Sequence, residues 1–270
     1  MIRFARAVAP VILLTLVTAL AAFAQSGAAA QAQQTPAAEE KAEQILKRAV
    51  DVLGGSNYLN VRTVVGRGLY TQFKEGQSGL PAKFTDYIIY PDRERTEFRG
   101  EGMRVIQTNA GDKGWVYDGA SKTLKDMTPE QVEDFRFGVR TSVDNLLRGS
   151  WRKEGAKLSY VGRREAGLAK RNETVRLVYP DGLSAEFEFG AKDGLPAKVI
   201  YKRKNKAGEE VTEEDRFAQQ VTIDGVITPF IIDHYRAGVQ SSRINYESVE
   251  FNRPLDDSLF ARPANAKAVK

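Results

Sequence analysis

The chain has 270 residues, with 40 Lys and Arg against 35 Asp and Glu, one histidine and no cysteine. The lack of cysteine excludes disulfides and thiolate metal sites, so the folded part must be held together by its core alone. The net charge of +5 is mild, and basic and acidic residues are interspersed. A nucleic-acid-binding protein would carry a basic stripe interleaved with aromatic residues. We therefore expect no nucleic-acid partner.

The N-terminus has the pattern of a secretion signal. Arg3 and Arg6 precede an apolar run over residues 8–22, and the Ala-Phe-Ala sequence that ends at Ala24 is a small-x-small cleavage site. The apolar run is shorter than the roughly 20 residues that a membrane-spanning helix needs. We therefore expect residues 1–24 to be a signal peptide and the mature protein to be soluble in the periplasm. The alternative is a signal that is retained as an anchor.

Composition divides the remainder of the chain into three parts. Residues 25–37 consist of Ala, Gln, Gly, Ser, Thr and Pro, with too few large apolar side chains to fold, and they predict a flexible tether. Residues 38–263 have an even composition and a length that single all-β barrels and sandwiches reach, so we expect one domain. The Ala- and Lys-rich residues 264–270 are expected to form a frayed tail.

Two segments have helical periodicity. In residues 42–53 apolar side chains recur at three- and four-residue spacing, and Gly54 follows as a helix-ending residue. Residues 128–131 read Thr-Pro-Glu-Gln, a capping box with proline at the first helical position. Behind that box an apolar stripe continues through residues 132–147 and stops at Gly149, so the sequence predicts a single mid-chain helix.

Strand-type alternation fills most of residues 61–126 and 157–251. Its clearest signal is the Asp-Gly pair at residues 224–225, which predicts a two-residue hairpin loop between alternating segments. Residues 184–189 have one apolar and one polar face, whereas residues 84–90 are apolar on both faces. A strand of the second kind is either covered on both sides or lines a cavity with one face, and the sequence leaves both interpretations open.

The fold class that follows is α+β: an open antiparallel β half-barrel of about 10–11 strands, with the N-terminal helix and the mid-chain helix covering its concave face.

Catalytic motifs are missing from the sequence. His234, the only histidine, stands in a predicted strand beside Asp233 and Tyr235, where a hydrogen-bonded structural role is the simpler interpretation. No nucleophile elbow, P-loop or dinucleotide motif is present. One histidine without thiolates leaves only carboxylates as metal ligands. We therefore expect a protein that is not an enzyme and uses no cofactor or metal. A hydrolase built on paired carboxylates is a weaker alternative.

Several short motifs resemble one known superfamily. Residues 224–229 (Asp-Gly-Val-Ile-Thr-Pro) are similar to a hairpin of LolA-like proteins, and residues 251–263 are similar to their closing motif. Residues 109–119, with Gly-Trp-Val-Tyr at their centre, resemble the Trp-bearing hairpin, and residues 193–199 resemble another strand start. Together with the order of elements, these motifs resemble the LolA/LolB-type lipoprotein-carrier superfamily.

The resemblance implies an open β-barrel around helices, with an apolar cavity that accepts a lipid or the acyl chain of a lipoprotein. The implied partners are a lipid or an acylated protein, with an inner- or outer-membrane protein as donor or acceptor. We expect the mid-chain helix to act as a lid. The expected cavity lining comprises five residues from strands and four from that helix: Phe84, Tyr87, Ile89, Trp115, Tyr117, Phe135, Val139, Val143 and Leu146. Ordinary core packing is the alternative for each of them.

A second class of function fits the same sequence. The fold that the resemblance implies also occurs in envelope-stress regulators, which sense lipids and bind a membrane-protein partner. Such a sensor or interaction module would use a surface rather than a cavity. The charged residues 196–216 are its candidate surface.

Overall fold

The computed structural model describes residues 35–269 except Glu101 and Lys206. The predicted signal peptide and most of the predicted tether lie outside these residues. Within the described ranges, no helix is long and apolar enough to cross a membrane. The first helix begins at Pro36, inside the predicted tether, because the Thr35 side chain caps it by accepting a hydrogen bond from the backbone N–H of Ala38.

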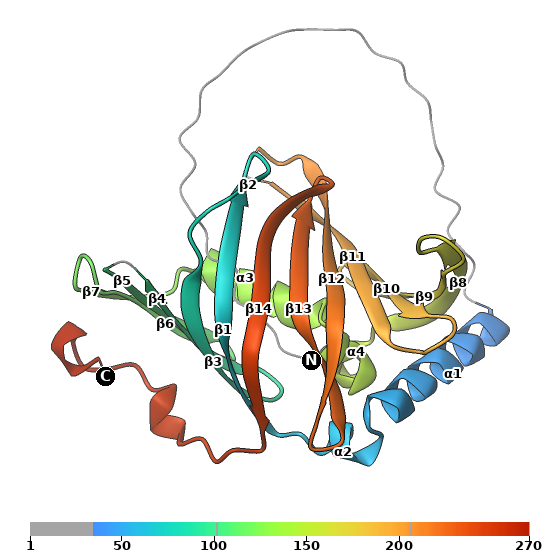
Figure 1. The fold of residues 1–270 in the computed structure, drawn as a ribbon, viewed down its shortest axis with the longest axis horizontal. Helices are drawn as coiled ribbons and strands as arrows, with labels where there is room; N and C mark the ends of the chain where they lie inside the picture. Colours follow the sequence, from blue (N-terminus) through green and yellow to red (C-terminus); the bar gives the residue numbers. More distant parts are fainter. Residues whose placement is uncertain (1–34, 101, 206, 270) are drawn as a thin grey trace, which may run out of the picture.

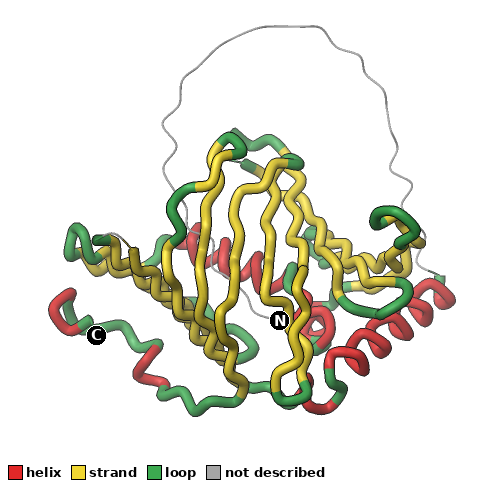
Figure 2. Tube along the Cα trace, in the orientation of Figure 1, coloured by secondary structure: helices red, strands yellow, loops and turns green. Residues whose placement is uncertain are grey.

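The helices of the described chain are short apart from the first (Figures 1 and 2). Their bounds are α1 Pro36–Leu53, α2 Ser56–Leu59, α3 Pro129–Arg140 and α4 Val143–Leu147, with 3-10 turns η1 Ser150–Glu154, η2 Asp257–Leu259 and η3 Ala266–Ala268. The strands are β1 Thr63–Lys74, β2 Gln77–Ser78, β3 Ala82–Ile89, β4 Arg93–Gly100, β5 Met103–Ala110, β6 Lys113–Asp118, β7 Thr123–Asp126, β8 Lys157–Glu165, β9 Arg171–Val178, β10 Ser184–Gly190, β11 Pro196–Lys204, β12 Glu210–Ile223, β13 Val226–Arg236 and β14 Val239–Phe251.

All the strands belong to one antiparallel sheet in the order β7-β6-β5-β4-β3-β1-β14-β13-β12-β11-β10-β9-β8, and β2 pairs with β1. In this order β7 and β8 are the two edges of an open sheet, which curves around the helices (Figure 1). The predicted α+β open half-barrel is therefore confirmed. The sheet has 14 strands, more than the sequence predicted, because short strands such as β2 carry little periodicity.

The single helix predicted after Thr128 is interrupted in the structure. The capping box of Thr128 and Gln131 starts α3 as predicted. However, α3 ends at Arg140 and α4 begins only at Val143, because Ser142 has an extended backbone and its hydroxyl caps α4 at the N–H of Asn145. The apolar periodicity continues across this break, so it does not reveal it.

We call the sheet face that packs against α1 and α4 the inner face. Its core joins the apolar stripe of α1, which includes Ala42 and Leu46, to strand residues such as Phe187, Val199 and Ile244. Burying one such large apolar side chain contributes roughly 1.5–3 kcal/mol. Helices α3 and α4 lie behind the sheet in Figure 1, on the inner-face side.

The predicted Asp-Gly hairpin loop joins β12 to β13. Both loop residues have positive φ, 49° at Asp224 and 75° at Gly225, as a type I′ turn requires. The carbonyl of Gly225 lies so close to Gly54 that an added Cβ would sit 2.3 Å from its oxygen. The glycine that ends α1 thus lets the helix end rest directly on this hairpin.

A smaller apolar cluster lies on the opposite, outer face and consists of Ile106, Trp115 and Tyr117. Residues 253–269, here called the C-terminal strap, run over it. Trp115 Nε1 donates a hydrogen bond of 3.1 Å to the carbonyl of Phe260, and Val269 packs against the cluster. Where the sequence leads us to expect a frayed tail after residue 263, the structure therefore has the 3-10 turn η3 and contacts with the outer face.

Candidate functional site

The nine residues expected to line a cavity do not share one face. Phe84, Val143 and Leu146 belong to the inner-face core. Phe135 is buried and Val139 half-buried, both on α3. Trp115 and Tyr117 belong to the outer cluster instead.

Strand register explains the division. Tyr87 pairs with Arg95, Arg95 with Thr108, and Thr108 with Trp115. Directly paired residues of antiparallel strands point to the same face, so Tyr87 points to the outer face with Trp115, and Ile89, two residues on, does the same. Phe84 points inward. The binding role of all nine residues stays a prediction, and Phe84, Val143 and Leu146 are the ones that the fold brings together in one core.

Aromatic side chains of five strands meet on the inner face and form what we call the aromatic group. The rings of Tyr70 and Phe98 lie 5.4 Å apart. Those of Phe84 and Tyr246 also lie 5.4 Å apart, nearly perpendicular at 79°, and Phe230 lies 6.3 Å from Tyr246. These distances are typical of favourable edge-to-face pairs. The aromatic group gives this part of the inner face an apolar surface.

Helix α3 is attached to the inner face at one side. Phe137 packs edge-on against Tyr201 of β11 at 5.4 Å, and Asp134 forms an ion pair with Arg203 of the same strand. Residues two positions apart in an α-helix are separated by about 200° around its axis. Phe135 therefore points away from the side of α3 on which Phe137 packs against Tyr201. Val132, Phe135 and Val139, at spacings of three and four, form a stripe on that other side. None of the three belongs to the two apolar clusters of the described residues.

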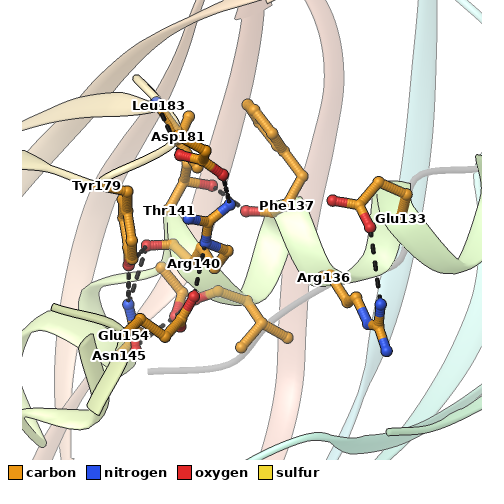
Figure 3. Close-up of polar contacts among 12 residues, drawn as sticks. Glu133, Arg136, Phe137, Arg140, Thr141, Asn145, Glu154, Tyr179, Asp181 and Leu183 are labelled. Carbon is orange, nitrogen blue, oxygen red and sulfur yellow. Dashed lines mark hydrogen bonds and ion pairs between the residues drawn. The ribbon is translucent and has the colours of Figure 1, made fainter. Parts of the chain in front are cut away.

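The C-terminal end of α3 is held by a polar network around Arg140 (Figure 3). The guanidinium forms ion pairs with Asp181 at 2.6 Å and Glu154 at 2.9 Å, and lies 4.0 Å from the centre of the Tyr179 ring. The Tyr179 hydroxyl donates to the Arg140 carbonyl at 2.8 Å, and Asn145 Nδ2 donates to the same carbonyl at 2.9 Å. The hydrogen bond from Arg140 holds the pKa of Asp181 below its ordinary value. This network fixes the junction between α3 and α4.

Polar side chains cross the inner face next to the aromatic group. Asp86 of β3, Glu94 and Thr96 of β4, and Asn109 of β5 are all buried and are here called the polar row. Thr96 Oγ1 donates to Asp86 Oδ1 at 2.8 Å. Burial, followed by the charge of Glu94, raises the pKa of Asp86 well above its ordinary value. This row was not predicted from the sequence, although Asp86 stands between Phe84 and Ile88 at a position where alternation calls for an apolar side chain.

Another buried carboxylate, that of Asp144 in α4, is well partnered. It accepts hydrogen bonds from the hydroxyls of Tyr58 at 2.8 Å and Tyr90 at 3.0 Å, and from Arg148 Nε at 3.2 Å. The Arg148 guanidinium also lies 4.1 Å from the centre of the Tyr90 ring. This arrangement ties α4 to α2 and to the end of β3, and its contacts account for its burial.

The hydrogen bond predicted for His234 is present, with Nδ1 lying 2.5 Å from Asp215 Oδ1. The charged residues 196–216, the alternative interaction surface, form much of β11 and β12. Their charges pair with one another and with neighbouring strands and α3: Lys198 with Glu188, Lys202 with Glu210, Arg203 with Asp134, and Arg216 with Glu214.

No protein-family profile and no curated protein matches the sequence. Solved structures do match the fold. A domain from Vibrio parahaemolyticus that is named for outer membrane lipoprotein sorting superposes with a TM-score of 0.56 at 12% identity, over 82% of this chain and 97% of that chain. A LolA superfamily protein from Nitrosomonas europaea gives 0.52 at 12% identity with the same coverage. The fold is LolA-like.

A DUF1329 family protein from Desulfovibrio piger shares this LolA-like fold, with a TM-score of 0.55 at 13% identity over 82% of this chain and 97% of that chain. The resemblance seen in the hairpin and closing motifs of the sequence is thereby confirmed at the level of the fold. Identities this low indicate a shared architecture and leave the residues of the inner face to be interpreted on their own chemistry.

Proposed function

We propose that the protein is a periplasmic, non-catalytic carrier that holds a lipid, or the acyl chain of a lipoprotein, against the inner face beside α3. The observation that carries this proposal is the stripe of Val132, Phe135 and Val139. It points away from the Tyr201 attachment and lies outside the two apolar clusters of the described residues. An apolar helix stripe packs against an apolar surface, and an acyl chain inserted beside the buried Phe135, between α3 and the inner face, would offer one.

The energetics suit a carrier. Each buried methylene contributes about 0.8 kcal/mol, so one long acyl chain supplies on the order of 10 kcal/mol before the cost of ordering it. Release requires that one wall of the site can move. The Arg140 network holds α3 at its C-terminal end, where Thr141 and Ser142 interrupt the helix. Movement about this junction would let α3 act as the lid, opening when the contacts of Phe137 and Asp134 with β11 separate.

The first test is native mass spectrometry of the protein purified from its own cell envelope, followed by organic extraction. A bound lipid or acylated peptide in stoichiometric amount is the expected result. Uptake of a fluorescent fatty acid by the extracted protein is the second measurement. A protein that is isolated empty and takes up no fatty acid would contradict the carrier function and favour the sensor or interaction module.

The site assignment is tested by Phe135→Glu, which places a charge in the proposed apolar site and should reduce fatty-acid uptake at least about tenfold. The matched control is Leu168→Glu, because Leu168 is 98% exposed in the loop between β8 and β9. Val143 is a poorer choice since it belongs to the inner-face core, where a charge would unfold the domain. Equal uptake by the two variants, with circular dichroism unchanged, would refute the site assignment.

A further inference from the structure

The polar row places acidic groups deep in an apolar setting. Asp86 is 0% and Glu94 1% exposed, and Asp86 lies in the same strand as Phe84 of the aromatic group, two residues away. Buried carboxylates normally have a cationic or hydrogen-bonding partner for each oxygen. Asp86 Oδ1 accepts a hydrogen bond from the Thr96 hydroxyl, but Asp86 Oδ2 has no hydrogen-bond partner among the described residues.

Asn109 is the second unsatisfied group in the row. It is 1% exposed, and neither its Oδ1 nor its Nδ2 has a hydrogen-bond partner within the described ranges. Asn109 pairs directly with Glu94 in the adjacent strand, so the two side chains point to the same face and into the same site. Each unsatisfied buried polar group costs about 1–3 kcal/mol. Three such atoms in one row indicate a surface that is built to receive a polar group.

Acidic side chains surround the row. The hydroxyl of Tyr246, in the neighbouring aromatic group, has a pKa raised well above its ordinary value by burial and then by the charges of Asp86 and Glu94. Asp144 contributes in the same direction, and its nearby cation, Arg148, is already held at 3.2 Å. An anionic group entering this site would meet carboxylates, whereas a cation would be attracted by them.

We propose that the polar row binds the positively charged nitrogen of a primary ammonium head group, while the alkyl chain of the same ligand lies against the aromatic group. This inference rests on the proposed function and names the class of amphiphile that the site selects. An ammonium has three donors and no acceptor, which suits the unpartnered Asp86 Oδ2 and Asn109 Oδ1, and Glu94 adds an acidic group on the same face. The rings of the aromatic group add cation–π attraction.

A metal ion is a poorer match to the same residues. The described part of the chain contains no group of three or more His, Cys, Asp or Glu side chains placed to hold a metal. Two carboxylates and one amide next to aromatic rings are suited to a nitrogen cation, which is bound by hydrogen bonds and ring faces rather than by a closed shell of oxygens.

The test compares three probes with one chain length: an alkyl amine, an alkyl alcohol and a fatty acid, each displacing an uncharged hydrophobic fluorophore from the purified protein. We expect the amine to displace it at least about tenfold more effectively than the alcohol, the gain typical of one charge-assisted hydrogen bond. Glu94→Gln should bring the two probes close to parity. Glu247→Gln is the matched control, since Glu247 is exposed and follows Tyr246 on the outer side of β14, and it should leave the preference unchanged.

The outcomes separate this inference from the proposed function. If all three probes bind equally well, or if the fatty acid binds best, the ammonium assignment is refuted while apolar binding stands. If no probe displaces the fluorophore, both are refuted. A preference for the amine that survives Glu94→Gln and Asn109→Leu would also overturn the assignment, because the cation would then be recognised elsewhere.

Discussion

Replacing Asp86 by Asn should stabilise the protein at neutral pH. Burial is the main cause of the raised pKa of Asp86, and the charge of Glu94 adds to it. When the pKa of an acid is higher in the folded than in the unfolded chain, the free energy of unfolding falls as the pH rises from the ordinary pKa through the folded-state pKa. Asn removes this loss because it is uncharged, and its oxygen can still accept the hydrogen bond from Thr96.

The size of the effect follows from the unsatisfied oxygen. A buried polar atom without a partner costs about 1–3 kcal/mol, and more when it is charged. The amide nitrogen of Asn would occupy the place of Asp86 Oδ2 and carries no charge for Glu94 to repel. We therefore expect a gain of about 1–2 kcal/mol at pH 7, or roughly 2–8 °C in Tm for a domain of this size. The same variant should lose amine binding, as expected where a functional site is maintained at the expense of stability.

Urea unfolding followed by circular dichroism measures this gain at pH 7 and at a pH below the ordinary pKa of Asp, where it should vanish. Asp144→Asn is the matched control, and it should lower rather than raise the free energy of unfolding. Its carboxylate is engaged by Tyr58, Tyr90 and Arg148, so its loss should cost about 3 kcal/mol or more. Unchanged or lower stability of Asp86→Asn at pH 7, or a gain that persists in acid, would refute the reasoning.

Three further predictions concern the parts that support the site. Gly54→Ala should lower the free energy of unfolding by about 2 kcal/mol or more in urea unfolding, since its φ is +124° and its Cβ would meet the Gly225 carbonyl at 2.3 Å. Trp115→Phe removes the hydrogen bond to Phe260 and should speed amide hydrogen exchange in the C-terminal strap, at a cost of about 1 kcal/mol. Arg140→Gln should speed hydrogen exchange in α3 while leaving exchange in β14 unchanged, because it removes both ion pairs at the helix junction.

Local signals in the sequence were sufficient to predict most of the helices and strands. The Asp-Gly pair at residue 224 has the positive φ values that its loop requires, and the capping box at Thr128 starts α3, because both features depend on residues a few positions apart. The alternation of strands and the helix period likewise sufficed for the half-barrel. These patterns describe the chain within a window of about a dozen residues.

The site was harder to predict from the sequence because it depends on the register between distant strands. Residues 84–90 are apolar on both faces, and only the pairing of Tyr87 through β4 and β5 to Trp115 shows which face is outer. The outer cluster is apolar because the C-terminal strap covers it, a contact between residues 145 positions apart in the case of Trp115 and Phe260. The break before α4 was hidden by an apolar stripe that continues on both sides of Ser142.

The order of strands has a consequence for how the half-barrel forms. Every ladder on the path from β7 to β8 joins strands that are near neighbours along the chain, except the central one, in which β1 pairs with β14. Closing a long loop costs more entropy than closing a hairpin, so the two arms of the sheet should assemble separately and the β1–β14 seam should close last. The pairing of β1 with β14 in the middle of the sheet, rather than pairing at either edge, would then limit the folding rate.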